Sequence, residues 1–263
     1  MRQKTIVLFL VLMSSLLLAI DSFAETIYLK NGKTIEGQIT KRNDTFIRVG
    51  GFKEFAGSIV FFNKEIDKID NKKTDNFVEI TSLLSKEELL NRSFYVLLLS
   101  SEQIGKNYKS AQPFFSLVIP NNTSRAWSFF RLNAPGGKFY IVDEKIFLEP
   151  TKGHPRIDCL PQPIPPEFIN KTPEEIFQEI SASYKNHADV GVNIINNGSP
   201  VADISNFKAF ERIEEIISQE RKWHTVVIFI DKYFLVFLLN SKIADFDQDD
   251  KDFINIVKTL AVK

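Results

Sequence analysis

The residues best suited to chemistry are a histidine, an aspartate and the only cysteine of the chain, which stand close together in a proline-rich stretch. His154, Asp158 and Cys159 could form a thiol nucleophile with its base, or part of a transition-metal site. A nucleophilic thiol needs a base within hydrogen-bond reach, and a metal site needs three or four ligands. His187 and His224 could complete either site only through folding. A buried or loop thiol without a chemical role is therefore favoured.

An acidic run near the C-terminus matches the first half of a calcium-binding loop. Asp245, Asp247 and Asp249 occupy the first, third and fifth positions of an EF-hand loop. The template also requires glycine at the sixth position and a bidentate glutamate at the twelfth, where this chain has Asp250 and Ile256. Without that glycine the loop cannot wrap around an ion. The run is therefore predicted to be a solvated acidic start of a helix.

Aromatic side chains are the remaining candidates for a binding surface. Trp127, Phe129 and Phe130 do not alternate regularly, which indicates that at least one of them points away from the core, and Trp223 stands beside His224. Core packing is the favoured interpretation of these residues. Trp127, Phe129 and Trp223 are kept as the candidate binding surface.

The elements that must position these residues predict a mixed α+β fold in the second half of the chain. Residues 226–230 and 233–239 are nearly all apolar and indicate a hairpin at the centre of a sheet covered on both faces. Further strands are expected at residues 114–119, 127–132, 139–148 and 189–195, the last of them ending at a turn over residues 196–198. Residues 207–218 fit a helix and a strand equally well.

Helix starts and proline positions complete this part of the pattern. Thr172, Pro173 and Glu175 form a capping box with proline at the first helical position. Asp249 and Asp250 are expected to open a last, amphipathic helix, whose N-terminal dipole favours acidic residues. The prolines of residues 153–166 predict an extended loop there. A helix on each side of an antiparallel sheet makes an α+β sandwich.

The N-terminal region predicts a small all-β module. Residues 26–30 and 34–42 alternate apolar and polar side chains around Asn31 and Gly32, a pair typical of a tight hairpin with two positive φ angles. Gly37 inside the second strand indicates a bulge or a sharp bend. Third and fourth strands are expected at residues 46–49 and 58–62.

This module resembles the Sm-like fold, in which a strongly bent five-stranded sheet closes a small barrel. The resemblance covers about 45 residues and is carried by the run from Leu29 to Gly32, Gly37 five residues later, and Asp44 before the third strand. A similar stretch opens many exported bacterial proteins. The RNA-contacting pattern of the Sm family is not evident in residues 57–69, so its RNA-binding function is not carried over.

The C-terminal region is similar to the PsbP-like fold, named for an extrinsic subunit of the photosynthetic water-oxidising complex. The order is an early strand ending in Pro120, Trp127 soon after, a capped helix, a hairpin and a C-terminal amphipathic helix. The resemblance covers residues 113–263 and includes no diagnostic residue. It implies an architecture, and a protein of non-enzymatic binding or accessory type in the periplasm or thylakoid lumen.

The first 24 residues predict export. Arg2 and Lys4 precede an apolar run over residues 6–20, and residues 22–24 supply a small-residue cleavage site before Glu25. The run is too short for a membrane span, which needs about 20 apolar residues. Cys159 is the single cysteine, so an internal disulfide is excluded.

The charge balance argues against nucleic acid as a partner. The chain has 33 basic and 33 acidic residues, and clustered excess basic residues are what a polyanion binder needs. Removing the leader takes away two basic residues and one acidic residue, which leaves a net charge near −1. No stable membrane insertion is expected after the leader is cleaved.

These observations predict an exported protein of the periplasm or the extracellular space. Its expected parts are a signal peptide at residues 1–24, a small β-barrel at 25–70, a linker and helical connection at 71–112, and an α+β domain at 113–263. No nucleophile elbow, zinc-binding His-Glu-x-x-His or paired-cysteine motif occurs in the sequence. We expect a non-enzymatic binding or accessory protein without a cofactor, whose partner is an envelope protein or a glycan. A secreted hydrolase with dispersed catalytic residues and a small-ligand carrier are the alternatives.

Overall fold

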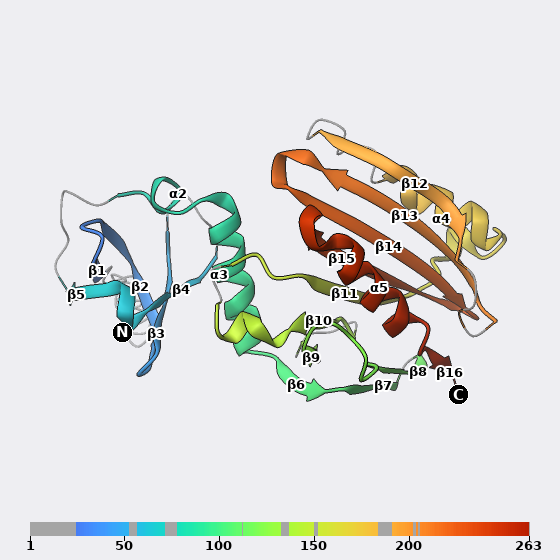
Figure 1. Ribbon diagram of the computed structural model, residues 1–263, viewed down its shortest axis with the longest axis horizontal. Helices are drawn as coiled ribbons and strands as arrows, with labels where there is room; N and C mark the ends of the chain where they lie inside the picture. Colours follow the sequence, from blue (N-terminus) through green and yellow to red (C-terminus); the bar gives the residue numbers. More distant parts are fainter. Residues whose placement is uncertain are drawn as a thin grey trace, which may run out of the picture. The chain divides into compact units, whose positions relative to one another are not determined.

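The chain divides into two compact units, Met1–Leu89 and Leu90–Lys263. The computed structural model, drawn in Figure 1, describes residues 25–52, 57–71, 78–111, 113–132, 137–149, 152–183, 191–201, 204 and 206–262. The expected signal peptide at residues 1–24 and His187 lie outside the described residues. Among the described residues, no helix is long and apolar enough to cross a membrane.

The first unit contains one antiparallel five-stranded sheet. Its strands are β1 (Glu25–Leu29), β2 (Thr34–Arg42), β3 (Phe46–Gly50), β4 (Ile59–Phe62) and β5 (Ile66–Asp70), in the order β4-β3-β2-β1-β5. Alternating side chains of β1 and β2, such as Ile27 and Ile35, face the core because successive residues of a strand point to opposite faces. The four strands expected from the sequence are confirmed.

The sheet of the first unit is open, and it does not form the closed barrel that the Sm-like resemblance implied. β1 pairs with β5 and β3 pairs with β4, whereas β4 and β5 stand at opposite ends of the strand order. β2 is long enough to pair with β1 through its first half and with β3 through its second half. A Cβ atom on Gly37, midway along β2, would lie 2.4 Å from Val49 Cγ1, so only glycine fits this close approach.

The hairpin between β1 and β2 differs from the expected two-residue turn. Gly32 has a positive φ of 83°, and Asn31 is not among the residues with positive φ. The Gly32 amide donates to the Leu29 carbonyl at 2.9 Å, and the Leu29 amide donates to the Lys33 carbonyl at 2.8 Å. The loop therefore has three residues and needs one positive φ angle, which is the next most common hairpin connection.

Two helices follow the first sheet, α2 (Ile80–Leu83) and α3 (Lys86–Leu99). Ser85 caps the N-terminus of α3, because the Glu88 amide donates to Ser85 Oγ at 3.1 Å. Two strands come next, β6 (Glu102–Gly105) and β7 (Asn107–Ala111). They lie in the stretch that was expected to be a linker and a helical connection.

The second unit contains a large antiparallel sheet with a helix on each face, so the predicted α+β class is confirmed. Eight strands follow the order β12-β13-β14-β15-β11-β10-β9-β6, and a small sheet has the order β16-β8-β7. The further elements are β8 (Phe114–Val118), β9 (Trp127–Arg131), β10 (Phe139–Asp143), β11 (Arg156–Pro163), α4 (Pro173–Ser183), β12 (Val192–Pro200), β13 (Lys208–Ile216), β14 (Arg221–Ile230), β15 (Tyr233–Lys242), α5 (Phe246–Val257) and β16 (Ala261–Val262).

The two faces of this sheet carry different cores. α5 lies across the hairpin of β14 and β15 (Figure 1), and its Phe253 packs with Phe237 and Ile228 in the larger core. α4 covers the opposite face, where Phe177 packs with Phe210. Successive side chains of this hairpin point alternately into the two cores. This explains why its sequence is almost wholly apolar.

β11 is a strand where the sequence predicted an extended loop. It pairs with β15 along its whole length, but with β10 only as far as Cys159, which lies opposite Phe139. Among the strands that the structure describes, Pro161 and Pro163 therefore have a neighbour on one side only. A proline without an amide hydrogen is tolerated at such an edge, and this is the reason that the loop prediction was wrong.

The ambiguous segment at residues 207–218 is the strand β13, and the turn expected at residues 196–198 belongs to the strand β12. The register of β12 shifts twice around Asn196 and Asn197, so the extra residues form bulges rather than a turn. Gly198 has a φ of 93°, and a Cβ atom there would lie 2.8 Å from Gln178 Nε2. The glycine therefore serves close packing against α4 instead of a chain reversal.

Both expected helices of the second unit are present. Thr172 and Glu175 exchange the two hydrogen bonds of a capping box at 2.7 and 3.2 Å, which confirms the predicted start of α4. α5 begins at Phe246, before the acidic pair that was expected to open it.

Candidate functional site

A small pocket lies on the α4 face of the large sheet. Three strands, β13, β14 and β15, supply its floor, and α4 supplies one wall. We call it the Trp223 pocket; its lining residues are Phe177, Ile180, Ser181, Arg212, Glu214, Trp223, Thr225, Val227, Val236 and Leu238. Its volume is about 50 Å³. Trp223 is partly exposed, so the pocket is reachable from solvent at this residue.

The polar end of the pocket is built around a buried arginine. The Arg212 side chain is 3% exposed; its Nη1 donates to the Ser181 carbonyl at 2.8 Å, and its Nη2 donates to Glu214. The Ser181 carbonyl belongs to the last turn of α4, where carbonyl groups lack helical partners and attract cations. Helix, strand and ion pair together therefore fix the position of the guanidinium group.

Two N–H groups of the pocket residues have no hydrogen-bond partner in the described part of the chain. They are Arg212 Nε and Trp223 Nε1, and both atoms are buried. A buried donor without an acceptor costs about 1 to 3 kcal/mol, so each such group in a native protein calls for an explanation. The pocket combines these two donors with apolar walls, which is the composition of a site that binds a small group.

Of the predicted binding surface, only Trp223 is accessible. Trp127 and Phe129 are fully buried, and Phe130 is 2% exposed, so these residues do not form a surface. β9 lies between β10 and β6 in the sheet. The Phe129 ring packs with the rings of Tyr108 and Phe139, and the Phe130 ring packs with that of Phe147. The interpretation as core packing is therefore the correct one for β9.

The three residues of the proline-rich stretch do not converge on a shared site. Cys159 is fully buried, and burial raises the pKa of its thiol well above the usual value. Asp158 pairs with Arg156 at 3.2 Å, and His154 Nε2 lies 2.8 Å from the Glu149 carbonyl. A thiol kept protonated in the core is a poor nucleophile, so the structural role that was favoured for Cys159 fits its environment.

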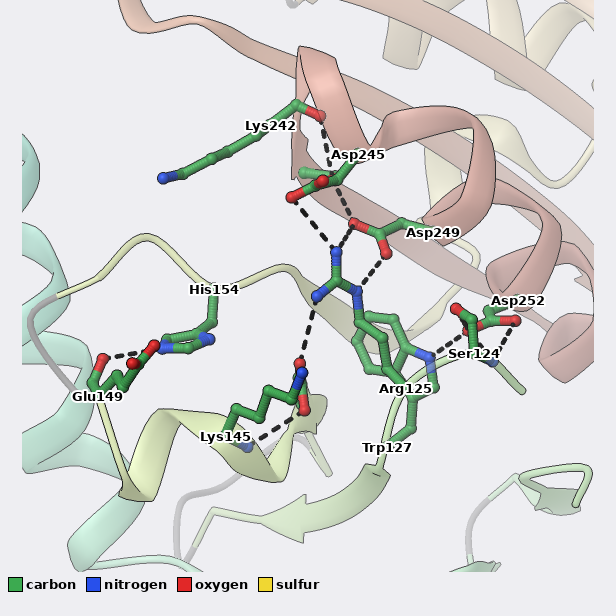
Figure 2. A network of polar contacts seen from close by, with 12 residues as sticks. Ser124, Arg125, Trp127, Lys145, Glu149, His154, Lys242, Asp245, Asp249 and Asp252 are labelled. Atoms are coloured by element: carbon green, nitrogen blue, oxygen red, sulfur yellow. Dashed lines mark hydrogen bonds and ion pairs between the residues drawn. The ribbon is translucent and has the colours of Figure 1, made fainter. Parts of the chain in front are cut away.

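The acidic run is only in part the solvated helix start that the sequence predicted, because Asp245 and Asp247 are exposed and Asp249 is fully buried. Figure 2 shows the Asp249 carboxylate turned toward the guanidinium group of Arg125. Arg125 binds Asp249 through Nε and, at 3.2 Å, through Nη2, and it pairs with Asp143 at 3.3 Å and with Asp245 at 3.4 Å. We call these four residues the Arg125 cluster. Among the described residues, no three side chains of metal-ligating type gather around an empty position.

The Arg125 cluster holds α5 against β9, β10 and β15. Ser241 Oγ donates to Asp249 at 2.5 Å, and one turn further along the helix Asp252 accepts from Trp127 Nε1 at 2.9 Å (Figure 2). Burial raises the pKa of Asp249, although the hydrogen bonds from Arg125 and Ser241 act in the opposite direction. The carboxylates of Asp249 and Asp252 are thus bound by groups of the protein itself.

His224 lies between two carboxylates on the α5 face of the sheet. Its Nδ1 is 2.5 Å from Asp250 and its Nε2 is 3.1 Å from Glu211, while its ring packs edge-to-face on Phe253. The side chain is 2% exposed. Both ring nitrogens have partners within the protein, so this histidine joins β13, β14 and α5 and leaves no nitrogen free for a metal ion.

Comparisons with solved structures give matches to this chain. A search of solved structures matches the chain to the solution structure of cyanobacterial PsbP (CyanoP) from Synechocystis sp. PCC 6803, at 15% sequence identity and a TM-score of 0.44. The match covers 61% of this chain and 94% of that chain. No protein-family model and no curated protein matches the sequence.

Sequence reasoning missed the polar end of the Trp223 pocket. Arg212 and Glu214 share a face of β13 with Phe210 and Ile216, as residues two apart in a strand must. A charged pair between apolar residues on a buried face was the available signal. It could not be recognised while residues 207–218 fitted a helix as well as a strand.

Proposed function

We propose that the protein is an exported, non-enzymatic binding or accessory protein of a bacterial cell envelope, and that the Trp223 pocket holds part of its ligand. The observation that carries the proposal is the presence of two buried donors without a described partner beside the apolar wall of α4. These donors are Arg212 Nε and Trp223 Nε1. Donors fixed in advance lose little entropy when a ligand binds, so the arrangement favours recognition.

A binding role also agrees with the state of the reactive side chains. A general acid, base or nucleophile must reach a substrate. The Cys159 thiol is enclosed in the core, and the Asp249 carboxylate and both nitrogens of His224 are engaged by neighbouring residues. These groups therefore contribute to the stability of the second unit. The residues of the Trp223 pocket supply the hydrogen bonds to a ligand.

The proposal of export rests on the sequence of the first 24 residues. Their charged, apolar and small-residue order is that of a cleaved leader, with Glu25 as the first residue of the mature chain. We also propose that the open, bent sheet of the first unit is a variant of the Sm-like fold and that the second unit is PsbP-like. The support for the latter is the antiparallel sheet with α4 and α5 on opposite faces.

The size of the pocket favours recognition of a chemical group on a larger partner. A volume of about 50 Å³ corresponds to roughly four water positions, which is too small to enclose a whole cofactor or lipid. An envelope glycan or an envelope protein could place such a group in the pocket while most of the partner molecule remains outside. The carrier alternative would need a larger enclosed cavity.

The proposal is tested with the mature protein and a matched variant, Trp223→Phe, which keeps an aromatic ring and removes the indole N–H group. Fractions of envelope extract are added, and thermal unfolding is followed by circular dichroism. If the protein binds a ligand in this pocket, at least one fraction should raise the unfolding temperature of the wild type. The same fraction should raise the unfolding temperature of Trp223→Phe much less. A panel of ester and glycoside substrates is assayed in parallel. Turnover that disappears when one polar residue is replaced would overturn the non-enzymatic proposal.

A further inference from the structure

The two unpartnered donors of the Trp223 pocket come from neighbouring positions on one face of the large sheet. Arg212 lies opposite Thr225 and Glu214 lies opposite Trp223 in the pairing of β13 with β14, so Arg212 and Trp223 are diagonal neighbours on one face. Diagonal neighbours are about 7 to 8 Å apart at the backbone, within reach of long side chains. A carbonyl oxygen has two lone pairs and can accept one hydrogen bond from each donor.

The charge of the pocket favours an uncharged ligand group. Arg212 already binds Glu214, and both side chains are buried, at 3% and 11% exposure. The pair is neutral as a whole, and a ligand carboxylate would stand next to the Glu214 carboxylate. An ionised ligand group would also lose its hydration without gaining an unpaired cation. The acceptor oxygen therefore belongs to a neutral carbonyl group.

The rest of the pocket matches the other parts of an amide. Val227, Val236 and Leu238 offer an apolar surface to a methyl group. The Glu214 carboxylate has more lone pairs than the Arg212 bond uses, so it can accept from an amide N–H group. The roughly four water positions of the pocket accommodate a group of four or five non-hydrogen atoms.

Resting on the proposed binding function, we propose that the Trp223 pocket binds an acetamido group, CH₃–C(=O)–NH–, at the end of an N-acetylated molecule. The carbonyl oxygen accepts from Arg212 and Trp223, the N–H group donates to Glu214, and the methyl group contacts the valines and the leucine. An acetylated amino sugar and an acetylated amino acid carry the same group, so the test includes both.

Indole N–H signals in ¹H–¹⁵N correlation spectra provide the test, because the chain has only two tryptophans. Trp223 reports on the pocket. Trp127 is an internal control, since its indole N–H donates to Asp252 in the core at 2.9 Å. Trp223→Phe assigns the two signals by removing one, and the wild-type titration does not depend on the folding of that variant.

The mature protein is titrated with N-methylacetamide, with methyl acetate, which lacks the N–H group, and with sodium acetate, which is charged. We expect a saturable downfield shift of the Trp223 signal with N-methylacetamide at millimolar concentration and an unchanged Trp127 signal. Methyl acetate should bind several-fold more weakly, and sodium acetate should give no saturable shift. N-acetylglucosamine and N-acetylalanine methylamide then show which source of the acetamido group is accepted.

Two results overturn the inference in different ways. Saturable binding of sodium acetate in preference to N-methylacetamide would show that the pocket is a binding site but that its ligand class is a carboxylate, and the proposed function would stand. A Trp223 signal that shifts with none of the five probes would overturn the acetamido proposal. The thermal-unfolding screen with Trp223→Phe would then decide separately whether the pocket binds anything.

Discussion

Replacement of Arg125 by methionine tests how the C-terminal helix is held in place. The Arg125 side chain is 19% exposed, whereas its two partners Asp143 and Asp249 are fully buried. Methionine fills a similar length without the charge, so the variant Arg125→Met leaves two carboxylates in the protein interior without their cation. The expected loss of stability comes mainly from these uncompensated charges.

The magnitude follows from the burial of the pair. Breaking a buried ion pair by removing one partner costs about 3 to 5 kcal/mol, whereas an exposed pair contributes about 0 to 1 kcal/mol. Lys152 and Glu149 form an exposed pair at 2.9 Å, so Lys152→Met is the matched control. We expect Arg125→Met to lower the free energy of unfolding by about 3 to 5 kcal/mol and the control by less than about 0.5 kcal/mol.

The assay is urea unfolding followed by circular dichroism, at several pH values. Burial gives Asp249 a folded-state pKa above its unfolded value, and Arg125 opposes this shift. Because the pKa of this acid is higher in the folded state, the folded state favours its protonated form. Protonation of Asp249 therefore contributes stability at low pH, and this contribution is lost as the pH rises through the folded-state pKa. The stability difference between wild type and Arg125→Met should therefore be largest near pH 7 and should shrink on acidification toward pH 4.

A second substitution separates charge from packing. Asp249→Asn removes one of the orphaned charges, so the double variant Arg125→Met, Asp249→Asn should be more stable at pH 7 than Arg125→Met alone, by at least about 1 kcal/mol. If Arg125→Met costs less than about 1 kcal/mol, or if its cost does not change with pH, the Arg125 cluster does not hold α5 as described.

Three other predictions concern separate parts of the chain. Cys159 should react with a disulfide reagent at least about a hundredfold more slowly in the native protein than in urea, because burial raises its pKa and blocks access; equal rates would contradict its placement in the core. Gly37→Ala should lower the free energy of unfolding by about 1 to 3 kcal/mol, since its Cβ atom would lie 2.4 Å from Val49 Cγ1, and an unchanged urea midpoint would show that β2 tolerates a side chain there. Glu214→Gln should leave the positive charge of Arg212 without its carboxylate and cause the Trp223 signal to shift with sodium acetate. No response to acetate would contradict the charge argument for the pocket.

Local sequence signals predicted the elements whose structure depends on neighbouring residues. The capping box at Thr172 needs only side chains three residues apart, and both of its hydrogen bonds are formed. The central hairpin was recognisable because both of its faces are covered, which makes it apolar throughout. Such patterns are set within one element.

The failures occurred where distant strands decide the outcome. The strand around Pro161 exists because β15 pairs with it and because β10 ends before the prolines. Asp249 is buried because Arg125, 124 positions earlier in the chain, supplies its cation. A local reading of an acidic helix start contains no information about that arginine.

The candidate site was only partly visible for the same reason. Trp223 was identified as a candidate, but its neighbours Arg212 and Glu214 come from a segment whose periodicity fits both a helix and a strand. Trp127 and Phe129 were grouped with it because their spacing is irregular, and only the packing of the folded chain shows that they are enclosed. Pairing of strands, which is a tertiary property, therefore assembled the pocket.

Native mass spectrometry of the protein isolated from the cell envelope tests export and ligand binding together. We expect a chain that begins at Glu25 and carries a non-covalently bound molecule, which is lost or strongly reduced in Trp223→Phe. A chain that retains Met1 and carries no bound molecule, or one whose bound molecule is equally abundant in the variant, would contradict this expectation.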